Sequence, residues 1–265
     1  MSKSEDRFVT VGCGEEARRI ALSWRNGLGV PVVWLGGFKS DMASTKASHL
    51  DAWAKRSGRP FLRFDYSGHG RSKGRFEEGS IGRWLEESLA AIRHCIETRP
   101  ILVGSSMGGW IALLAARELT RDCARRPAGL VLIAPAVDFT QTLIWESLPR
   151  QARRAIERKG VWLQPSAYSP EPYPITRNLI EEGRHHLLLD KPVKTGCPVH
   201  ILQGMRDPDV PWRHAVTLME HMADDHCVMT LVNDGDHRLS REQDLATLVK
   251  AIEGIDREES PNRSD

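Results

Sequence analysis

The sequence predicts an α/β protein with a mostly parallel, eight-stranded sheet flanked by helices. Short apolar runs alternate with longer amphipathic segments, which is the order of a parallel sheet covered by helices. The runs are continuously apolar, as expected of strands that are buried on both faces. The chain has 265 residues, 40% of them hydrophobic, and is large enough to enclose such a core.

The predicted strands begin with an edge pair and continue with six inner strands. An antiparallel edge pair is expected at 8–11 and 20–24. The inner strands are expected at 30–35, 60–65, 101–104, 129–134, 199–203 and 228–232. Apolar residues at three-to-four spacing predict helices at 44–55, 81–97, 108–119, 212–221 and 241–252.

One interval does not fit this alternation. Roughly 60 residues separate the strand at 129–134 from the next one, where a simple crossover needs far fewer. The interval contains amphipathic pieces at 143–156 and 175–189. We predict that residues 138–195 form a cap inserted into a discontinuous core of residues 1–137 and 196–256. The polar residues 257–265 are predicted to be a disordered tail.

Composition argues against several classes of protein. The 37 basic and 35 acidic residues leave a net charge of +2, so nucleic acid is not an expected partner. No stretch approaches the roughly 18 apolar residues that a membrane span needs. The five cysteines are scattered and lack CxxC spacing, which indicates reduced thiols rather than a disulfide framework or a zinc site. Because the polar start, Met1 to Arg7, also lacks signal-peptide character, the predicted location is the cytoplasm.

A serine between glycines follows the strand at 101–104. Gly104-Ser105-Ser106-Met107-Gly108 matches the G-x-S-x-G pattern, in which a strained strand-to-helix turn exposes the serine hydroxyl. Only small residues two positions before and after that serine avoid a clash. Ser105 is the competing candidate, but its flanks are Val103 and Met107, both too bulky. The pattern therefore predicts Ser106 as a nucleophile.

Two backbone N–H groups are candidates to stabilise an oxyanion beside this serine. The first belongs to Met107, at the start of the predicted helix. The second is expected in the loop after the strand at 30–35, where Gly36-Gly37 lets the backbone turn inward. Phe38 is the best candidate in that loop.

A serine hydroxyl needs a base within hydrogen-bond reach. Of the ten histidines, His237 alone follows the last predicted strand, within Asn233-Asp234-Gly235-Asp236-His237, where a flexible loop can place an imidazole over the serine. A metal site built from His214, His221 and His226 is the alternative, but these residues lack the HExxH spacing. We expect no metal and no organic cofactor.

The acid that orients the histidine is expected in a loop after a neighbouring strand. Asp207 and Asp209 both follow the strand at 199–203, and Asp138 follows the strand at 129–134. We favour Asp207, three residues after Gly204, and the other two remain alternatives. The acid would fix the tautomer of the histidine and stabilise its imidazolium without taking a proton.

These three loops resemble those of the α/β-hydrolase superfamily, and further segments sharpen the resemblance. Residues 64–72 resemble the turn that follows the fourth strand in that superfamily. From about residue 30 to 240 the chain is similar to the ABHD10-like branch of acyl-protein thioesterases and acyl-glucuronide esterases. The resembling segments are 45–47, 64–68, 104–110, 159–162, 185–186, 197–198 and 204–212.

The resemblance implies an α/β-hydrolase fold in which Ser106, Asp207 and His237 are the triad, and Phe38 and Met107 the oxyanion donors. Animal members carry a mitochondrial targeting sequence and this chain begins close to the catalytic domain, so we expect a bacterial, cytoplasmic member. The acyl preference is not carried over, because Phe38 would reshape the acyl pocket.

The predicted function is hydrolysis of a carboxylic ester or thioester through an acyl-enzyme on Ser106, with a small molecule or an acylated protein as substrate. Lactone, peptide and perhydrolase chemistry remain alternatives, because the fold does not fix the substrate. A non-catalytic binding module is a further alternative, although such proteins usually lack one of the three residues. The sequence does not predict an oligomeric state.

Three cap residues are candidates for substrate binding: Trp145, His185 and His186. The apolar residues 143–145 and Leu148 are interpreted either as the wall of an acyl tunnel or as a stripe packed on the core. The basic residues of 150–159 either attract acidic substrates or form a solvated helix face.

Overall fold

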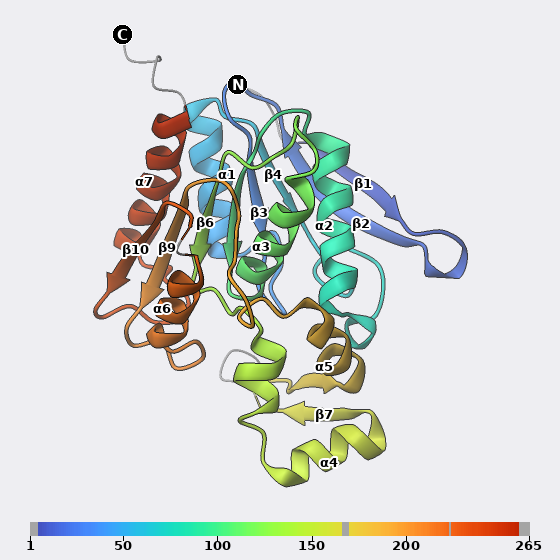
Figure 1. Cartoon of the computed structure of the whole chain (residues 1–265). Coiled ribbons are helices and arrows are strands. Elements are labelled where there is room, and N and C mark those ends of the chain that lie inside the picture. Colours follow the sequence, from blue (N-terminus) through green and yellow to red (C-terminus); the bar gives the residue numbers. More distant parts are fainter. Residues whose placement is uncertain (1–4, 166–169, 223, 260–265) are drawn as a thin grey trace.

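The computed structural model describes residues 5–165, 170–222 and 224–259. Within them, eight strands form one sheet in the order β1-β2-β4-β3-β5-β6-β9-β10 (Figure 1). β1 (Glu5–Val11) and β2 (Arg18–Arg25) are antiparallel, and β2 is also antiparallel to β4 (Phe61–Phe64). All other neighbours in the sheet pair in parallel. The mostly parallel eight-stranded sheet and its antiparallel edge pair are confirmed.

The remaining strands of the sheet lie within two residues of their predicted ends. They are β3 (Val32–Leu35), β5 (Ile101–Ser105), β6 (Gly129–Ile133), β9 (Val199–Gly204) and β10 (Cys227–Val232). Every residue of β3, β5 and β6 is buried, because both faces of the sheet are covered. β10 lies at the edge of the sheet opposite β1 and is only partly buried.

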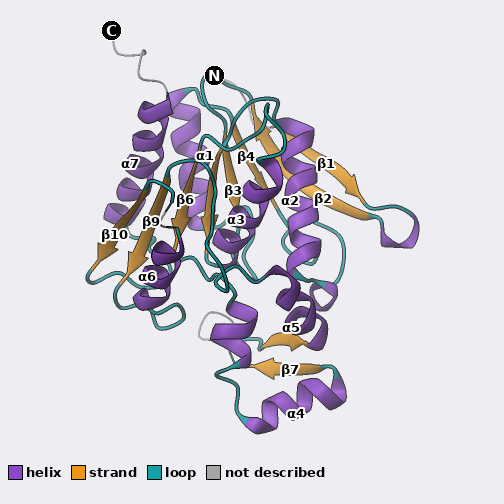
Figure 2. Cartoon of the chain, in the orientation of Figure 1, coloured by secondary structure: helices purple, strands orange, loops and turns teal. Residues whose placement is uncertain are grey.

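Helices cover both faces of the sheet (Figure 2). α1 (Thr45–Ser57) and α7 (Glu242–Glu259) share one apolar cluster with the sheet. α2 (Ile81–Cys95), α3 (Met107–Leu119) and α6 (Trp212–His221) contribute to the larger cluster on the other face. All five helices were predicted, and the order of layers is that of a doubly covered sheet.

The chain between β6 and β9 folds outside the sheet. It forms a π-helical turn (Thr140–Trp145), α4 (Arg150–Lys159), the antiparallel hairpin of β7 (Val161–Gln164) and β8 (Tyr173–Thr176), and α5 (Arg177–Gly183). Figure 1 shows α4, β7 and α5 beyond the end to which the arrowheads of β6 and β9 point, the carboxyl end of the parallel strands. This segment has a small apolar cluster of its own, around Leu148, Ile156 and Ile180.

Three predictions for secondary structure need correction. The piece at 143–156 is interrupted before α4, because Pro149 cannot continue the preceding turn. The piece at 175–189 begins as strand β8 and becomes helical only at Arg177. α7 extends to Glu259, since Arg257, Glu258 and Glu259 are good helix formers, so the predicted tail at 257–265 begins as helix. Residues 260–265 lie outside the described part.

Among the described residues, no helix has both the length and the apolar character needed to cross a lipid bilayer.

Candidate active site

The predicted nucleophile lies on a strained turn between β5 and α3. Ser106 has φ 55° and ψ −120°, a combination that a residue with a side chain adopts only where its surroundings enforce it. A Cβ on Gly104 would lie 2.3 Å from the Gly108 carbonyl oxygen, and one on Gly108 only 2.1 Å from that of Leu35. The two glycines are therefore required for this turn, which agrees with the steric argument for Ser106 over Ser105.

The loop after β3 passes close to Ser106. A Cβ on Gly37 would lie 3.4 Å from the Ser106 Cβ, so the backbone of this loop is in near contact with the serine. The Ser40 N–H donates to the Gly37 carbonyl at 3.1 Å, which closes a turn with Phe38 and Lys39 at its centre. The peptide between Gly37 and Phe38 is trans, so its carbonyl and its N–H point in opposite directions. Because the Gly37 carbonyl is bound by Ser40 within the turn, the Phe38 N–H points out of the turn.

The start of α3 provides the second predicted donor. Met107 is the first helical residue after Ser106 and is buried. The N–H groups of the first helical turn have no partner within the helix and carry its positive dipole end. Phe38 and Met107 thus belong to two backbone segments that border the same serine.

His237 connects Ser106 to Asp207. Its Nε2 lies 3.1 Å from Ser106 Oγ, and its Nδ1 lies 2.8 Å from Asp207 Oδ2. The side chain of Asp207 is fully buried, whereas that of His237 is 16% exposed. The structure therefore brings the three predicted triad residues into one hydrogen-bonded chain.

The Asp207 carboxylate is held by further donors. Its Oδ1 accepts from the N–H groups of Asp209 (2.9 Å) and Val210 (2.8 Å). Its Oδ2 also accepts from Gln203 Nε2 at 3.2 Å. Because the carboxylate is bonded on both oxygens, its plane and its direction toward His237 are fixed. Gln203 was not predicted to belong to the site. It could have been noticed as a polar residue within the largely apolar run of β9.

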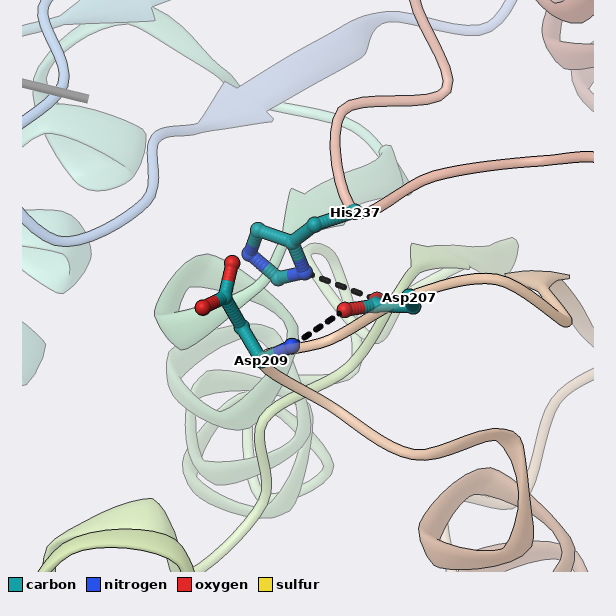
Figure 3. A group of neighbouring side chains, drawn as sticks. All are labelled: Asp207, Asp209 and His237. Carbon is teal, nitrogen blue, oxygen red and sulfur yellow. Dashed lines mark hydrogen bonds and ion pairs between the residues drawn. The ribbon is translucent and has the colours of Figure 1, made fainter. Parts of the chain in front are cut away.

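The other two candidate acids lie differently. The Asp209 carboxylate is exposed and lies beside His237 (Figure 3), with one oxygen within 4.8 Å of the ligand atoms of both Asp207 and His237. Asp138, at φ 56°, accepts from the N–H groups of Leu188 (3.0 Å) and Leu189 (2.8 Å). Asp138 therefore binds the backbone of the segment that leads back to β9.

The same three side chains, Asp207, Asp209 and His237, are close enough together to be considered as a cation site. Both ring nitrogens of His237 already have partners, Nδ1 in Asp207 and Nε2 in Ser106. A metal on either nitrogen would have to displace one of these bonds, so the donor set fits a proton-transfer chain better than a metal centre.

A cavity of about 620 Å³ opens onto Ser106 and His237. One part of its wall is apolar and comes largely from the segment between β6 and β9. Its residues there are Phe139, Leu143, Ile144, Tyr173 and Ile175. Another part is polar and comes from the start of α1 and the loop of His237, and includes Ser44, Lys46 and Arg238.

The three predicted substrate-binding residues are not among the described residues that line this cavity. The guanidinium groups of Arg153 and Arg184 lie over the ring of Trp145, at 5.6 and 5.3 Å. His186 Nε2 is 2.7 Å from Glu182 Oε1, and His185 is exposed. A role for these three residues in substrate binding remains a prediction. Phe139 and Tyr173, which do line the cavity, were not singled out from the sequence.

Comparison with known families identifies the fold and its relatives. The profile described as "Alpha/beta hydrolase family" matches residues 27–251. The chain belongs to the alpha/beta hydrolase family. This membership agrees with the eight-stranded, mostly parallel sheet and with the position of Ser106 on the turn after β5.

Curated relatives place this alpha/beta hydrolase beside one branch of the family. "Palmitoyl-protein thioesterase ABHD10, mitochondrial" of Bos taurus is 37% identical over 225 residues, which cover 84% of this chain and 72% of the relative. The Homo sapiens protein of the same name is 34% identical over 227 residues, with the same coverage. The resemblance to the ABHD10-like branch is confirmed.

Solved structures of the family agree. A protein from Agrobacterium vitis S4, whose crystal structure is known, is 48% identical in sequence to this chain. The two structures have a TM-score of 0.93 over 96% of this chain and 99% of that one. Mouse alpha/beta hydrolase domain-containing protein 10 is 32% identical, with a TM-score of 0.83 over 95% and 98%. Est1E from Butyrivibrio proteoclasticus, only 18% identical over 96% of this chain and 100% of its own, shares the fold with a TM-score of 0.74.

Proposed function

We propose that this alpha/beta hydrolase cleaves carboxylic esters or thioesters through an acyl-enzyme on Ser106. The observation that carries the proposal is the position of His237 between Ser106 Oγ (3.1 Å) and Asp207 Oδ2 (2.8 Å). A hydroxyl is activated by a base only within such reach, and the base needs a third group to orient it. The relatives named palmitoyl-protein thioesterases support the ester or thioester class.

The first half-reaction follows from the two hydrogen bonds of His237. With its proton on Nδ1 and directed at Asp207, the neutral ring presents the Nε2 lone pair to the Ser106 hydroxyl. As Oγ bonds to the substrate carbonyl carbon, its proton passes to Nε2. The carbonyl oxygen becomes an oxyanion, for which Phe38 N–H and Met107 N–H are the proposed donors. The imidazolium then protonates the departing alcohol or thiol.

The second half-reaction repeats these steps with water. His237 takes a proton from a water molecule, the resulting hydroxide attacks the acyl carbon, and the second oxyanion uses the same donors. The tetrahedral intermediate collapses, Ser106 leaves with the proton from Nε2, and the carboxylic acid is released. Asp207 carries its negative charge throughout and stabilises the imidazolium twice in each turnover.

We also propose that residues 138–195 act as a cap that provides the acyl-binding wall. Five apolar residues of this segment line the cavity, and the helices and hairpin that contain them lie at the carboxyl end of the parallel strands. An apolar wall beside a nucleophile suits an acyl group. The substrate class then includes small-molecule esters and acylated proteins.

We retain the cytoplasm as the proposed location. None of the five cysteines is in a disulfide, which supports a reducing compartment. The curated relatives are named as mitochondrial proteins, so cell fractionation of the native host is the appropriate test.

A substrate panel tests the proposed reaction. Purified protein should hydrolyse p-nitrophenyl esters or acyl thioesters of one or more chain lengths, and Ser106→Ala should reduce kcat by at least about 10³-fold. The ratio of the two substrate classes at equal acyl length assigns ester or thioester preference. Equal activity of the wild type and Ser106→Ala on every substrate would remove the proposal.

A further inference from the structure

His69 joins two loops that meet behind the proposed oxyanion donor. It belongs to the turn after β4, and its Nε2 accepts from the Lys39 N–H at 3.2 Å, although 30 residues separate the two. Lys39 directly follows Phe38 in the loop after β3. No step of the proposed reaction uses His69, so its contact with this loop needs a separate explanation.

The hydrogen bonds of His69 define one protonation state. Nδ1 lies 3.1 Å from the Ser67 carbonyl oxygen, which can only accept, so the proton is on Nδ1 and Nε2 carries the lone pair. The residue is 5% exposed, and its ring meets those of Tyr66, Phe76 and Trp84 edge-on. This burial lowers the pKa of His69 to about 4, which keeps Nε2 an acceptor at neutral pH.

The turn that contains Phe38 has a backbone that its residues do not favour. Gly37 and Ser40 are its ends, and Lys39, the third residue, has φ 59° while Phe38 does not have a positive φ. This combination corresponds to a type II turn, which favours glycine at the third position. A lysine there carries conformational strain, which the loop would relieve by leaving the type II turn.

The bond to His69 opposes that change of conformation. It fixes the direction of the Lys39 N–H, and therefore the plane of the peptide after Phe38. The bond from Ser40 N–H to the Gly37 carbonyl closes the turn and fixes the peptide before Phe38, to which the Phe38 N–H belongs. Both peptide planes next to Phe38 are thus held by hydrogen bonds, and oxyanion donors are effective only when they are oriented before the charge develops.

We propose that His69 is a positioning residue for the oxyanion hole: its Nε2 binds the Lys39 N–H, keeps the strained type II turn from opening, and so keeps the Phe38 N–H of that turn directed at the reacting carbonyl. This inference rests on the proposed function, because it assigns a role within that same site. It differs from a packing role in one respect. Only the acceptor at Nε2 matters for catalysis, and the shape of the ring matters for stability.

Three variants separate the acceptor from the shape. His69→Phe keeps a planar ring among Tyr66, Phe76 and Trp84 but has no acceptor. His69→Gln keeps an acceptor near the position of Nε2 without the ring. Lys39→Gly removes the strain at the third position of the turn, so the turn no longer depends on the bond.

The experiment measures kcat and KM for one ester that the wild type cleaves, together with the melting temperature of each variant. His69→Phe should lower kcat by about 10- to 100-fold with KM changed less than about threefold, because a misdirected donor affects the transition state more than substrate binding. His69→Gln should recover at least about tenfold of that loss. The double variant His69→Phe/Lys39→Gly should also exceed His69→Phe by about tenfold.

Two results would overturn the inference: a kcat of His69→Phe within twofold of the wild type, or a loss that neither His69→Gln nor Lys39→Gly reduces and that follows the melting temperature instead. If His69→Phe does not fold, His69→Gln decides: it should keep kcat within about tenfold of the wild type, and a larger loss of kcat in a variant that melts like the wild type would overturn the inference. Failure of the proposed function is recognised separately, as a wild type no more active than Ser106→Ala.

Discussion

The Nε2 atom of His237 lies 3.1 Å from the hydroxyl oxygen of Ser106, although 131 residues separate the two in the chain. The loop that carries His237 is positioned by bonds to the loop of Asp207. The Arg206 N–H donates to the Gly235 carbonyl, and the Met205 N–H to that of Val232, each at 2.9 Å. The loops of Asp207 and His237 are thus placed as one unit beside the strained Ser106, and the following predictions test the roles proposed for these residues.

Asp207→Asn should reduce kcat by about 10³- to 10⁴-fold with little change in folding. The amide oxygen can still accept from Asp209 N–H and Val210 N–H, but the amide NH₂ then faces His237 Nδ1. That contact favours the tautomer with the proton on Nε2, which cannot accept the serine proton. Steady-state kinetics with a chromogenic ester provides the measurement.

Matched changes at the other two carboxylates serve as controls. Asp209→Asn should leave kcat within about threefold, because the exposed charge is screened by water. Asp138→Asn should leave kcat similarly unchanged and lower the free energy of unfolding by about 1 kcal/mol, since it weakens the bonds from Leu188 and Leu189. A larger loss of kcat at either position than at Asp207 would show that Asp207 is not the acid that orients His237.

Phe38→Pro should reduce kcat by about 10²- to 10³-fold, because proline removes the N–H proposed to bind the oxyanion. Proline is favoured at the second position of a type II turn, so the loop should keep its shape. Phe38→Ala is the matched control, since it removes the same ring but retains the N–H. If the alanine variant loses as much kcat as the proline variant, the donor is not at Phe38.

His69 should make the stability of the protein depend on pH below neutrality. Burial lowers its pKa to about 4, against the hydrogen bond to the Ser67 carbonyl, which raises the pKa; the charge of Lys39 lowers it further and that of Asp41 raises it. An unfolded chain protonates this histidine below about pH 6.5, whereas the folded protein resists protonation until about pH 4. The stabilisation is therefore complete above pH 6.5 and is lost as the pH falls toward 4, by about 3 kcal/mol in total.

The free energy of urea unfolding at pH 7 and pH 4.5 checks this dependence. His69→Gln does not titrate, so its stability should fall by about 2–3 kcal/mol less than that of the wild type over the same interval. The difference between the two proteins cancels the contributions of all other titrating groups. Parallel curves for the two proteins would show that His69 is protonated equally in both states.

Leu143→Trp should shorten the acyl chains that the enzyme accepts. Leu143 lines the cavity from the segment between β6 and β9, and a larger side chain there reduces the space beside Ser106. We expect kcat/KM for an octanoyl or longer ester to fall by about tenfold or more, with the acetyl ester changed less than twofold. An equal change for both chain lengths would place the acyl group elsewhere in the cavity.

The central sheet was predictable because strands that are buried on both faces are continuously apolar in sequence. β3, β5 and β6 are short, continuously apolar runs, and each lies within two residues of its predicted bounds. The turn at Ser106 was predictable for a different reason. Its geometry excludes any side chain at Gly104 and Gly108, so the two glycines mark it in the sequence.

The segment between β6 and β9 was less predictable. β8 is four residues long and contains Pro174, a combination that argues against a strand unless a partner such as β7 is already known. The sequence also does not show that His186 pairs with Glu182, whose carboxylate accepts from the Gly82 N–H of α2. That arrangement depends on how α5 meets α2, which is a property of the tertiary packing.

The choice among the acids also depended on the fold. Asp207 and Asp209 lie two residues apart in one loop, and either spacing is compatible with a histidine above Ser106. The backbone N–H groups of Asp209 and Val210 hold Oδ1 of Asp207 and thereby direct Oδ2 to His237. The role proposed for His69 was likewise not evident from the sequence, because it requires the loops after β3 and β4 to be in contact.

Covalent labelling with a fluorophosphonate tests the central claim most directly, because the reagent reacts with a serine only where a base and an oxyanion site activate it. The wild type should gain one label per chain, and peptide mass spectrometry should locate it at Ser106. Ser106→Ala should gain none, and His237→Ala should react far more slowly than the wild type. An unlabelled wild type, or a Ser106→Ala variant labelled as readily as the wild type, would contradict the assignment of Ser106 as the nucleophile.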